Sequence, residues 1–64
     1  MKVKTSKEIL QALTADGWYE INVEGSHHQF KHPVKKGKVT LQHPKKEITG
    51  NVLKSIERQS GLNF

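Results

Sequence analysis

The sequence predicts an α+β fold in the order α-β-β-β-α, with a three-stranded antiparallel sheet and two helices on one face. Apolar residues recur at helical spacing near both ends of the chain and alternate with polar residues in the middle. Glycine or proline marks most of the changes between these patterns. With 64 residues, the chain is expected to form a single domain over 1–64, and no cysteine is present to form disulfides.

The first helix is predicted over about 6–16. Thr5-Ser6-Lys7-Glu8 has the pattern of a capping box, in which the first and last side chains satisfy each other's backbone amides. Ile9, Leu10 and Leu13 then form an apolar stripe. Gly17 fits the left-handed position that ends a helix.

A hairpin follows, because the period changes to two after Trp18. Gly25-Ser26 suits a type II′ turn, since glycine stands at the first central position. Such a turn predicts the cross-strand pairs Glu24–His27, Val23–His28, Asn22–Gln29, Ile21–Phe30 and Glu20–Lys31.

The third strand is predicted over about 38–43 and ends at Pro44. Its expected register pairs His32 with Val39, Phe30 with Leu41, Gln29 with Gln42 and His28 with His43. The second helix is predicted over about 50–60, with Thr49 as N-cap, a hydrophobic staple between Ile48 and Leu53, and Gly61 at its end.

Helices and sheet are expected to enclose one apolar layer. Its predicted members are Ile9, Leu10, Leu13, Tyr19, Ile21, Val23, Phe30, Val39, Leu41, Val52, Leu53 and Ile56, with Trp18 as a lid. The opposite face of the sheet is expected to expose Glu20, Asn22, Glu24, His27, Gln29, Lys31, Thr40 and Gln42.

Positive charge is concentrated in the middle of the chain. The net charge is +5, yet residues 27–46 contain six lysines and no acidic residue. Such a segment suggests a polyanionic partner, although a solvated lysine-rich face has the same composition. The lysines expected to bind the phosphates of a nucleic-acid partner are Lys31, Lys35, Lys36, Lys38, Lys45 and Lys46.

His27 is the side chain best suited to acid–base chemistry. It begins a strand directly after a tight turn, and alternation points it away from the core. Imidazole exchanges protons near neutral pH, and Glu24 across the hairpin is expected to orient it. With lysines to hold a phosphate, these groups suffice to cleave RNA through its own 2′-hydroxyl without a metal ion. The alternative is an exposed histidine without a function.

The other three histidines are expected to be structural. His28 and His32 share the parity of Phe30 and lie at the core's edges, while His43 closes the sheet. A metal ion shared by these three is the weaker alternative, because their spacing matches no zinc motif. Phosphate-binding and dinucleotide-binding fingerprints are also absent from the sequence, so no cofactor is expected.

The order of several short motifs is more specific than any one of them. The chain resembles the HicA family of bacterial toxins over nearly its whole length. The resemblance rests on Asp16-Gly17-Trp18, on Gly25-Ser26-His27-His28-Gln29-Phe30-Lys31-His32-Pro33, on Val39-Thr40-Leu41-Gln42-His43-Pro44, and on Lys46-Glu47-Ile48, Gly50, Ser55-Ile56 and Gly61-Leu62.

That resemblance implies a fold like the double-stranded-RNA-binding domain and an endoribonuclease that cleaves mRNA and stops translation and growth. It also implies a HicB-type antitoxin as partner, and it assigns the catalytic role to His27, the histidine after Gly-Ser. Glu24, Gln29 and His43 are the expected auxiliary residues. The sequence departs from the family at Gln42, where HicA proteins often carry proline, and this departure bears on His43.

Two other function classes are compatible with the sequence. A non-catalytic module could grip double-stranded RNA through the basic loop 33–38, and an interaction protein could dock an acidic partner on the same charges. No apolar run approaches the length of a membrane span, and the N-terminus does not resemble a signal peptide. We therefore expect a cytoplasmic protein without a membrane partner.

Overall fold

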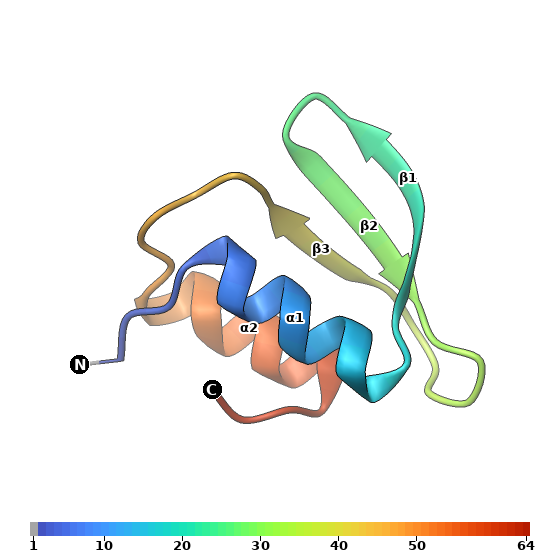
Figure 1. Ribbon diagram of the computed structural model, residues 1–64. Coiled ribbons are helices and arrows are strands. Elements are labelled where there is room, and N and C mark those ends of the chain that lie inside the picture. Colours follow the sequence, from blue (N-terminus) through green and yellow to red (C-terminus); the bar gives the residue numbers. More distant parts are fainter. Residues whose placement is uncertain (1) are drawn as a thin grey trace.

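The computed structural model describes residues 2–64 and has the predicted order of elements. The elements are α1 (Ser6–Asp16), β1 (Tyr19–Glu24), β2 (His27–Lys31), β3 (Val39–Gln42) and α2 (Gly50–Ser60). The sheet has the order β1-β2-β3 with antiparallel neighbours. Both helices lie on the side of β3, while the β1–β2 hairpin extends away from them (Figure 1). The predicted α+β fold is confirmed.

The helix bounds follow from their end residues. The Thr5 hydroxyl accepts from the Glu8 amide at 3.1 Å, and the Glu8 carboxylate accepts from the Thr5 amide at 3.0 Å, so the capping box is confirmed. These bonds to Thr5 lower the pKa of Glu8. Thr49 occupies the N-cap position of α2, but its hydroxyl makes no capping bond. Gly17 and Gly61 end the two helices in the left-handed conformation, as predicted.

The core joins both helices to β2 and β3. Trp18 is buried, as expected of a lid, and Ile48 is buried with Leu53, the other half of the predicted staple. Leu10 packs against the core from a partly buried position. The buried apolar residues are Ile9, Leu13, Trp18, Phe30, Val39, Leu41, Ile48, Leu53 and Ile56.

Four predicted core residues are wrong. Tyr19, Ile21 and Val23 are 51%, 43% and 46% exposed, and Val52 is 53% exposed. The physical reason is coverage, because the helices pack on β3 and leave β1 uncovered (Figure 1). Val52 lies on the outer surface of α2, whose buried residues are Leu53, Ile56 and Ser60.

The hairpin register is confirmed near the turn and wrong beyond it. Glu24, Val23 and Asn22 pair as predicted, and then a β-bulge shifts the register between Glu20 and Asn22. Phe30 therefore faces Glu20, and Lys31 faces Tyr19. An extra residue in one strand is invisible to alternation alone. The bulge turns Glu20 toward the helix side, so its predicted place on the outer face is wrong.

The predicted register between β2 and β3 is wrong by two residues. His28 pairs with Leu41 and Phe30 with Val39, rather than with His43 and Leu41. Gln29 likewise pairs with Thr40, not with Gln42. β2 ends at Lys31. The next residue, His32, uses its ring to accept hydrogen bonds from the amides of Val34 and Lys35 in the following turn. A shift of two residues preserves the faces, so Phe30, Val39 and Leu41 remain buried.

Candidate functional site

His27 has a fixed backbone and an exposed side chain. Gly25 has a φ of 59°, while Ser26 lies outside the positive-φ region, as a type II′ turn requires. The Ser26 carbonyl accepts from the His43 amide at 2.8 Å, which ties the turn to the end of β3. Within the described residues 2–64, the His27 ring has no hydrogen bond or ion pair. The ring is therefore free to meet a ligand.

Two polar residues face His27 across the sheet. Glu24 is its partner on β1, as predicted, and Gln42 is its partner on β3. The Gln42 amide oxygen accepts from the Lys45 ammonium at 3.5 Å, so that cation lies at the same end of the sheet. Gln29 follows two residues along β2, on the same face, and is half-buried.

Ser6 holds the segment that carries Lys45. Its buried hydroxyl accepts from the Lys45 amide at 2.8 Å, and its own amide donates to the Lys45 carbonyl at 2.8 Å. The same hydroxyl contacts the Nδ1 atom of His43 at 2.7 Å. The sequence offered no sign of this role, because Ser6 reads only as part of a capping box. Lys45 is thus an exposed cation on an anchored backbone.

The predicted RNA-binding lysines do not gather in one place. Lys45 and Lys46 follow β3 at the His27 end of the sheet, whereas Lys31, Lys36 and Lys38 lie at the opposite end. A five-residue strand such as β2 separates these ends by roughly 16 Å. All five of these lysines are exposed, so the basic segment forms two groups of free cations.

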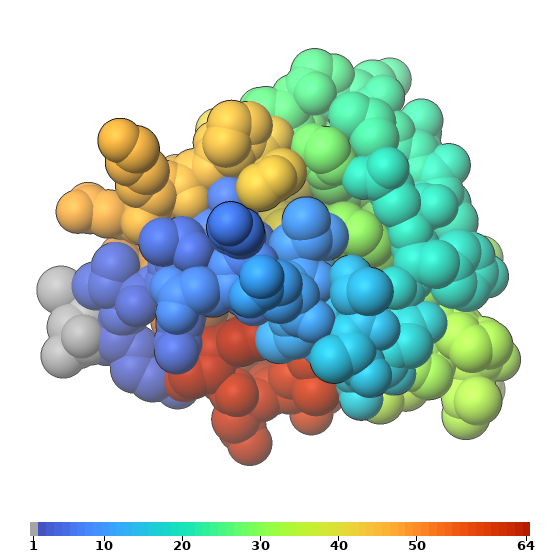
Figure 2. All heavy atoms as spheres, viewed as in Figure 1, coloured from blue at the N-terminus to red at the C-terminus, as the bar shows by residue number. Residues whose placement is uncertain are grey.

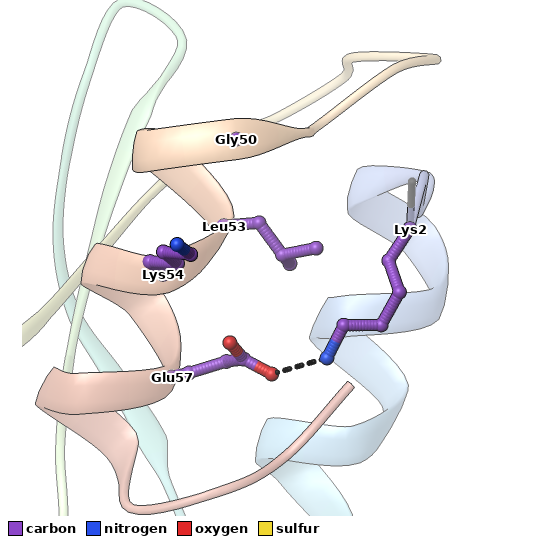
Figure 3. Close-up of a pocket in the computed structure, with 5 residues that line it drawn as sticks. All are labelled: Lys2, Gly50, Leu53, Lys54 and Glu57. Atoms are coloured by element: carbon purple, nitrogen blue, oxygen red, sulfur yellow. Dashed lines mark hydrogen bonds and ion pairs between the residues drawn. The ribbon is translucent and has the colours of Figure 1, made fainter.

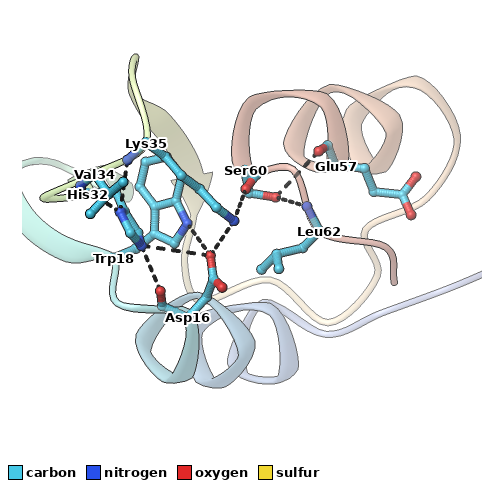
Figure 4. Close-up of polar contacts among 8 residues, drawn as sticks. All are labelled: Asp16, Trp18, His32, Val34, Lys35, Glu57, Ser60 and Leu62. Atoms are coloured by element: carbon cyan, nitrogen blue, oxygen red, sulfur yellow. Dashed lines mark hydrogen bonds and ion pairs between the residues drawn. The ribbon is translucent and has the colours of Figure 1, made fainter.

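Lys35, the sixth, is engaged in the fold. Its ammonium donates to the Asp16 carboxylate at 2.6 Å and to the Ser60 carbonyl at 3.0 Å, joining the ends of both helices (Figure 4). The hydrogen bond from Lys35, with a smaller contribution from the Trp18 indole, holds the pKa of Asp16 below its usual value. Much of the Lys35 charge is therefore balanced within the protein.

His32 is a structural residue, as expected. Its Nε2 atom donates to the Asp16 carbonyl at 2.7 Å, and its Nδ1 atom accepts from the amides of Val34 and Lys35, each at 3.0 Å (Figure 4). This pattern fixes the neutral Nε2–H tautomer, because Nδ1 accepts twice. The ring also packs edge-on against Trp18, with 5.2 Å between the two ring centroids. Both nitrogens are occupied, so His32 has none left for a substrate.

His28 and His43 form a second cluster on the helix side of the sheet. His28 Nδ1 contacts the Glu20 carboxylate at 2.5 Å, and His28 Nε2 donates to the His43 carbonyl at 3.2 Å. The two rings meet edge-on at 5.4 Å. The His43 side chain therefore lies on the face opposite His27.

Among residues 2–64, no cluster of metal-binding side chains accompanies His27. No group of three or more histidine and acidic side chains in this described part of the chain could hold a metal ion. A cavity of about 390 Å³ lies between α2 and the N-terminal segment, lined by Lys2, Gly50, Leu53, Lys54 and Glu57 (Figure 3). Lys2 and Glu57 form an ion pair of 2.9 Å across it. It contains no histidine and lies far from the β1–β2 turn (Figure 1).

Comparison with known protein families shows to which family the chain belongs. The family model described as the HicA toxin of bacterial toxin-antitoxin systems matches residues 6–62. The chain belongs to the HicA toxin family. Membership gives it a toxin role and implies an antitoxin partner. A search of curated proteins found no match to the chain. Within residues 2–64, none of the helices is long and apolar enough to cross a membrane.

The sequence motifs of this HicA chain lie at two different ends of the fold. Asp16-Gly17-Trp18 and His32-Pro33 meet in the network that joins α1, α2 and the β2–β3 turn. A Cβ atom on Gly17 would lie 2.9 Å from His32 Nε2, so this contact requires glycine. Gly25-Ser26-His27 instead forms the open end of the hairpin. Only the second motif presents an unoccupied side chain.

Proposed function

We propose that this HicA toxin is a metal-independent endoribonuclease that cleaves mRNA and thereby inhibits translation and growth. The observation that carries the proposal is His27, whose ring has no hydrogen bond within residues 2–64. It follows a turn that is bonded to the end of β3, and the anchored cation Lys45 lies at the same end of the sheet. A cytoplasmic location follows from the substrate. A HicB-type antitoxin is the partner that would neutralise the activity.

The proposed reaction uses the nucleophile of the RNA itself. His27 takes the proton from a ribose 2′-hydroxyl, and the 2′-oxygen forms a bond to the adjacent phosphorus. The bond between phosphorus and the 5′-oxygen breaks, and that oxygen takes a proton from solvent. The products are a 2′,3′-cyclic phosphate and a 5′-hydroxyl. Proton transfer by a positioned base contributes about 10²- to 10⁴-fold to such a rate.

Lys45 and Glu24 have supporting roles in this proposal. The Lys45 ammonium stabilises the negative charge that develops on the phosphate, and Gln42 steadies the ammonium. Glu24, the partner of His27 on β1, is the residue that would orient the ring. The remote group of Lys31, Lys36 and Lys38 binds phosphates further along the RNA.

A non-catalytic module that binds double-stranded RNA is the second candidate. The observation that favours it is the second group of exposed lysines, which needs no chemistry to contact phosphates. Substitution of His27 distinguishes the two functions, because RNA binding through Lys36 and Lys38 does not require the His27 ring.

The test is cleavage of a labelled mRNA fragment by the purified toxin in excess chelator. We expect cleavage with 2′,3′-cyclic phosphate ends, and we expect His27→Ala and His27→Gln to lose it about 10²- to 10⁴-fold while still binding RNA. Wild-type cleavage rates in both variants would contradict the proposal. So would activity that disappears in chelator and returns with magnesium or manganese.

A further inference from the structure

The two edges of the sheet differ in their protection. On β3, the Thr40 amide donates to the Gln59 side chain of α2 at 3.3 Å, and both helices pack against this strand. On the other side, β1 pairs only with β2, and all six of its residues are exposed. Proteins usually cover or disrupt such an edge, because its free backbone groups can pair with another chain. The open edge of β1 is therefore available to a partner strand.

Three large apolar side chains lie on this open strand. Tyr19, Ile21 and Val23 are each about half exposed, in a chain with a mean hydropathy of −0.72. In the sequence they alternate with polar residues, which is why they were predicted to be in the core, but the bulge places Tyr19 and Val23 on opposite faces of the sheet. In Figure 2 the atoms of this segment form an uncovered border of the molecule. β1 thus has the apolar composition of a buried strand, although neither helix covers it.

The charge of β1 is opposite to that of the protein as a whole. Its acidic residues are Glu20 and Glu24, and it contains no lysine or arginine, whereas the chain has a net charge of +5. Glu20 is bonded to His28, and Glu24 lies beside the turn. An RNA phosphate backbone would be repelled by this edge. A strand with apolar and basic side chains complements it.

We propose that the free edge of β1 is the docking site of the antitoxin, which adds a strand of its own to the sheet. This inference rests on the proposed function. Apolar side chains of the added strand cover Ile21 and Val23, and a basic side chain faces Glu24. The regular segment Asn22–Glu24 offers the pairing, because the bulge interrupts the strand before it.

Docking at this edge would also explain inhibition. Adjacent strands lie about 4.8 Å apart, so an added strand lies roughly 10 Å from β2 and beside Glu24, the partner of His27. The antitoxin's flanking residues can then cover the His27 ring. A second copy of this chain is a poorer occupant, since two β1 edges would bring four glutamates together without a basic residue on either strand.

The test uses a matched pair of double variants. Ile21→Ser with Val23→Ser removes the apolar surface of the edge, and Val34→Ser with Val52→Ser removes two exposed valines elsewhere. Each is compared with the wild type for RNA cleavage, thermal stability and affinity for the HicB-type antitoxin co-produced with the toxin. We expect all three to cleave RNA equally. Only the edge variant should bind antitoxin more weakly, by about 10- to 100-fold.

Hydrogen exchange gives an independent measurement on the unmodified proteins. The amides of β1 should become protected when the antitoxin binds. Neutralisation of the edge variant at the wild-type affinity, with β1 amides still exchanging, would overturn the inference and leave the proposed function intact. A toxin dimer that the edge substitutions disrupt, or loss of RNA binding in the edge variant, would also overturn it. A wild-type chain that neither cleaves RNA nor is neutralised would instead refute the proposed function.

Discussion

The two ends of β2 each carry a histidine, and the two side chains have opposite surroundings. His32, just beyond the end of the strand, uses both ring nitrogens within the protein and packs on Trp18. His27, at the start, makes none of these contacts. The lysines follow the same division, since Lys35 near His32 is bound to Asp16, whereas Lys45 near His27 presents an exposed ammonium.

Residue type alone therefore does not identify a functional group in a small basic domain. The number of unused hydrogen-bonding groups distinguishes the two histidines, although both belong to the motifs that resemble the family. We therefore expect changes at the His32 end to alter stability, and changes at the His27 end to alter activity.

The largest effect on stability is expected for His32→Ala. The change leaves the Asp16 carbonyl and two turn amides without their partner and removes a largely buried ring, at a cost of about 3 kcal/mol. For a domain of this size, thermal unfolding should shift down by on the order of 15 °C. Cleavage per folded molecule should be unchanged. A melting temperature equal to that of the wild type would show that the His32 contacts contribute nothing.

Gly17→Ala should have the next largest effect. Gly17 has a φ of 105°, and the added Cβ atom would lie 2.9 Å from the His32 ring, so we expect a loss of about 2 kcal/mol. Gly37→Ala is the matched control, with a φ of 87° and no atom within 4 Å of the added Cβ. It should lose about 1 kcal/mol, from backbone strain alone. Equal losses in denaturant unfolding would argue against the close packing of Gly17 on His32.

A smaller effect is expected from acid. Lys35 lowers the pKa of Asp16 in the folded protein, so this pair contributes stability at pH values above the pKa that Asp16 has in the unfolded chain. That stability is lost as the pH falls below about 4 and passes through the folded-state value. In Lys35→Met, unfolding measured between pH 6 and pH 2 should depend less on pH than in the wild type. Parallel curves for the two proteins would contradict this role.

The smallest effect is expected for single groups of lysines in RNA binding. Changing Lys36 and Lys38 to Gln removes two free cations and should reduce the slope of log affinity against log salt by about 1.4 on single-stranded RNA. Lys35→Gln should change the slope less, because its charge is paired with Asp16. Equal slope changes per lysine would show that Lys35 leaves Asp16 to bind RNA.

Local patterns were sufficient for the helices and for the hairpin turn. The capping box at Thr5, the glycines after each helix and the Gly25-Ser26 turn all act within a few residues, so their signals are complete in the sequence. The exposure of His27 follows from the same turn and from strand alternation. These features placed the candidate catalytic residue correctly on the outer face.

Contacts between distant segments could not be predicted. The bulge at Ile21 moved Glu20 to the helix side, and the His32 turn shifted the register of β3. The ion pair between Lys35 and Asp16, which lie 19 residues apart, was not predicted. The exposure of β1 was also missed, because alternation shows that a strand has an apolar face and not whether a helix covers it.

The most direct test of this division is to measure RNA cleavage and thermal stability together for His27→Ala and His32→Ala. We expect opposite results: His27→Ala keeps the wild-type melting temperature and loses cleavage by at least about a hundredfold, whereas His32→Ala melts far lower and cleaves normally while folded. Cleavage at the wild-type rate by His27→Ala, or lost cleavage in fully folded His32→Ala, would contradict it.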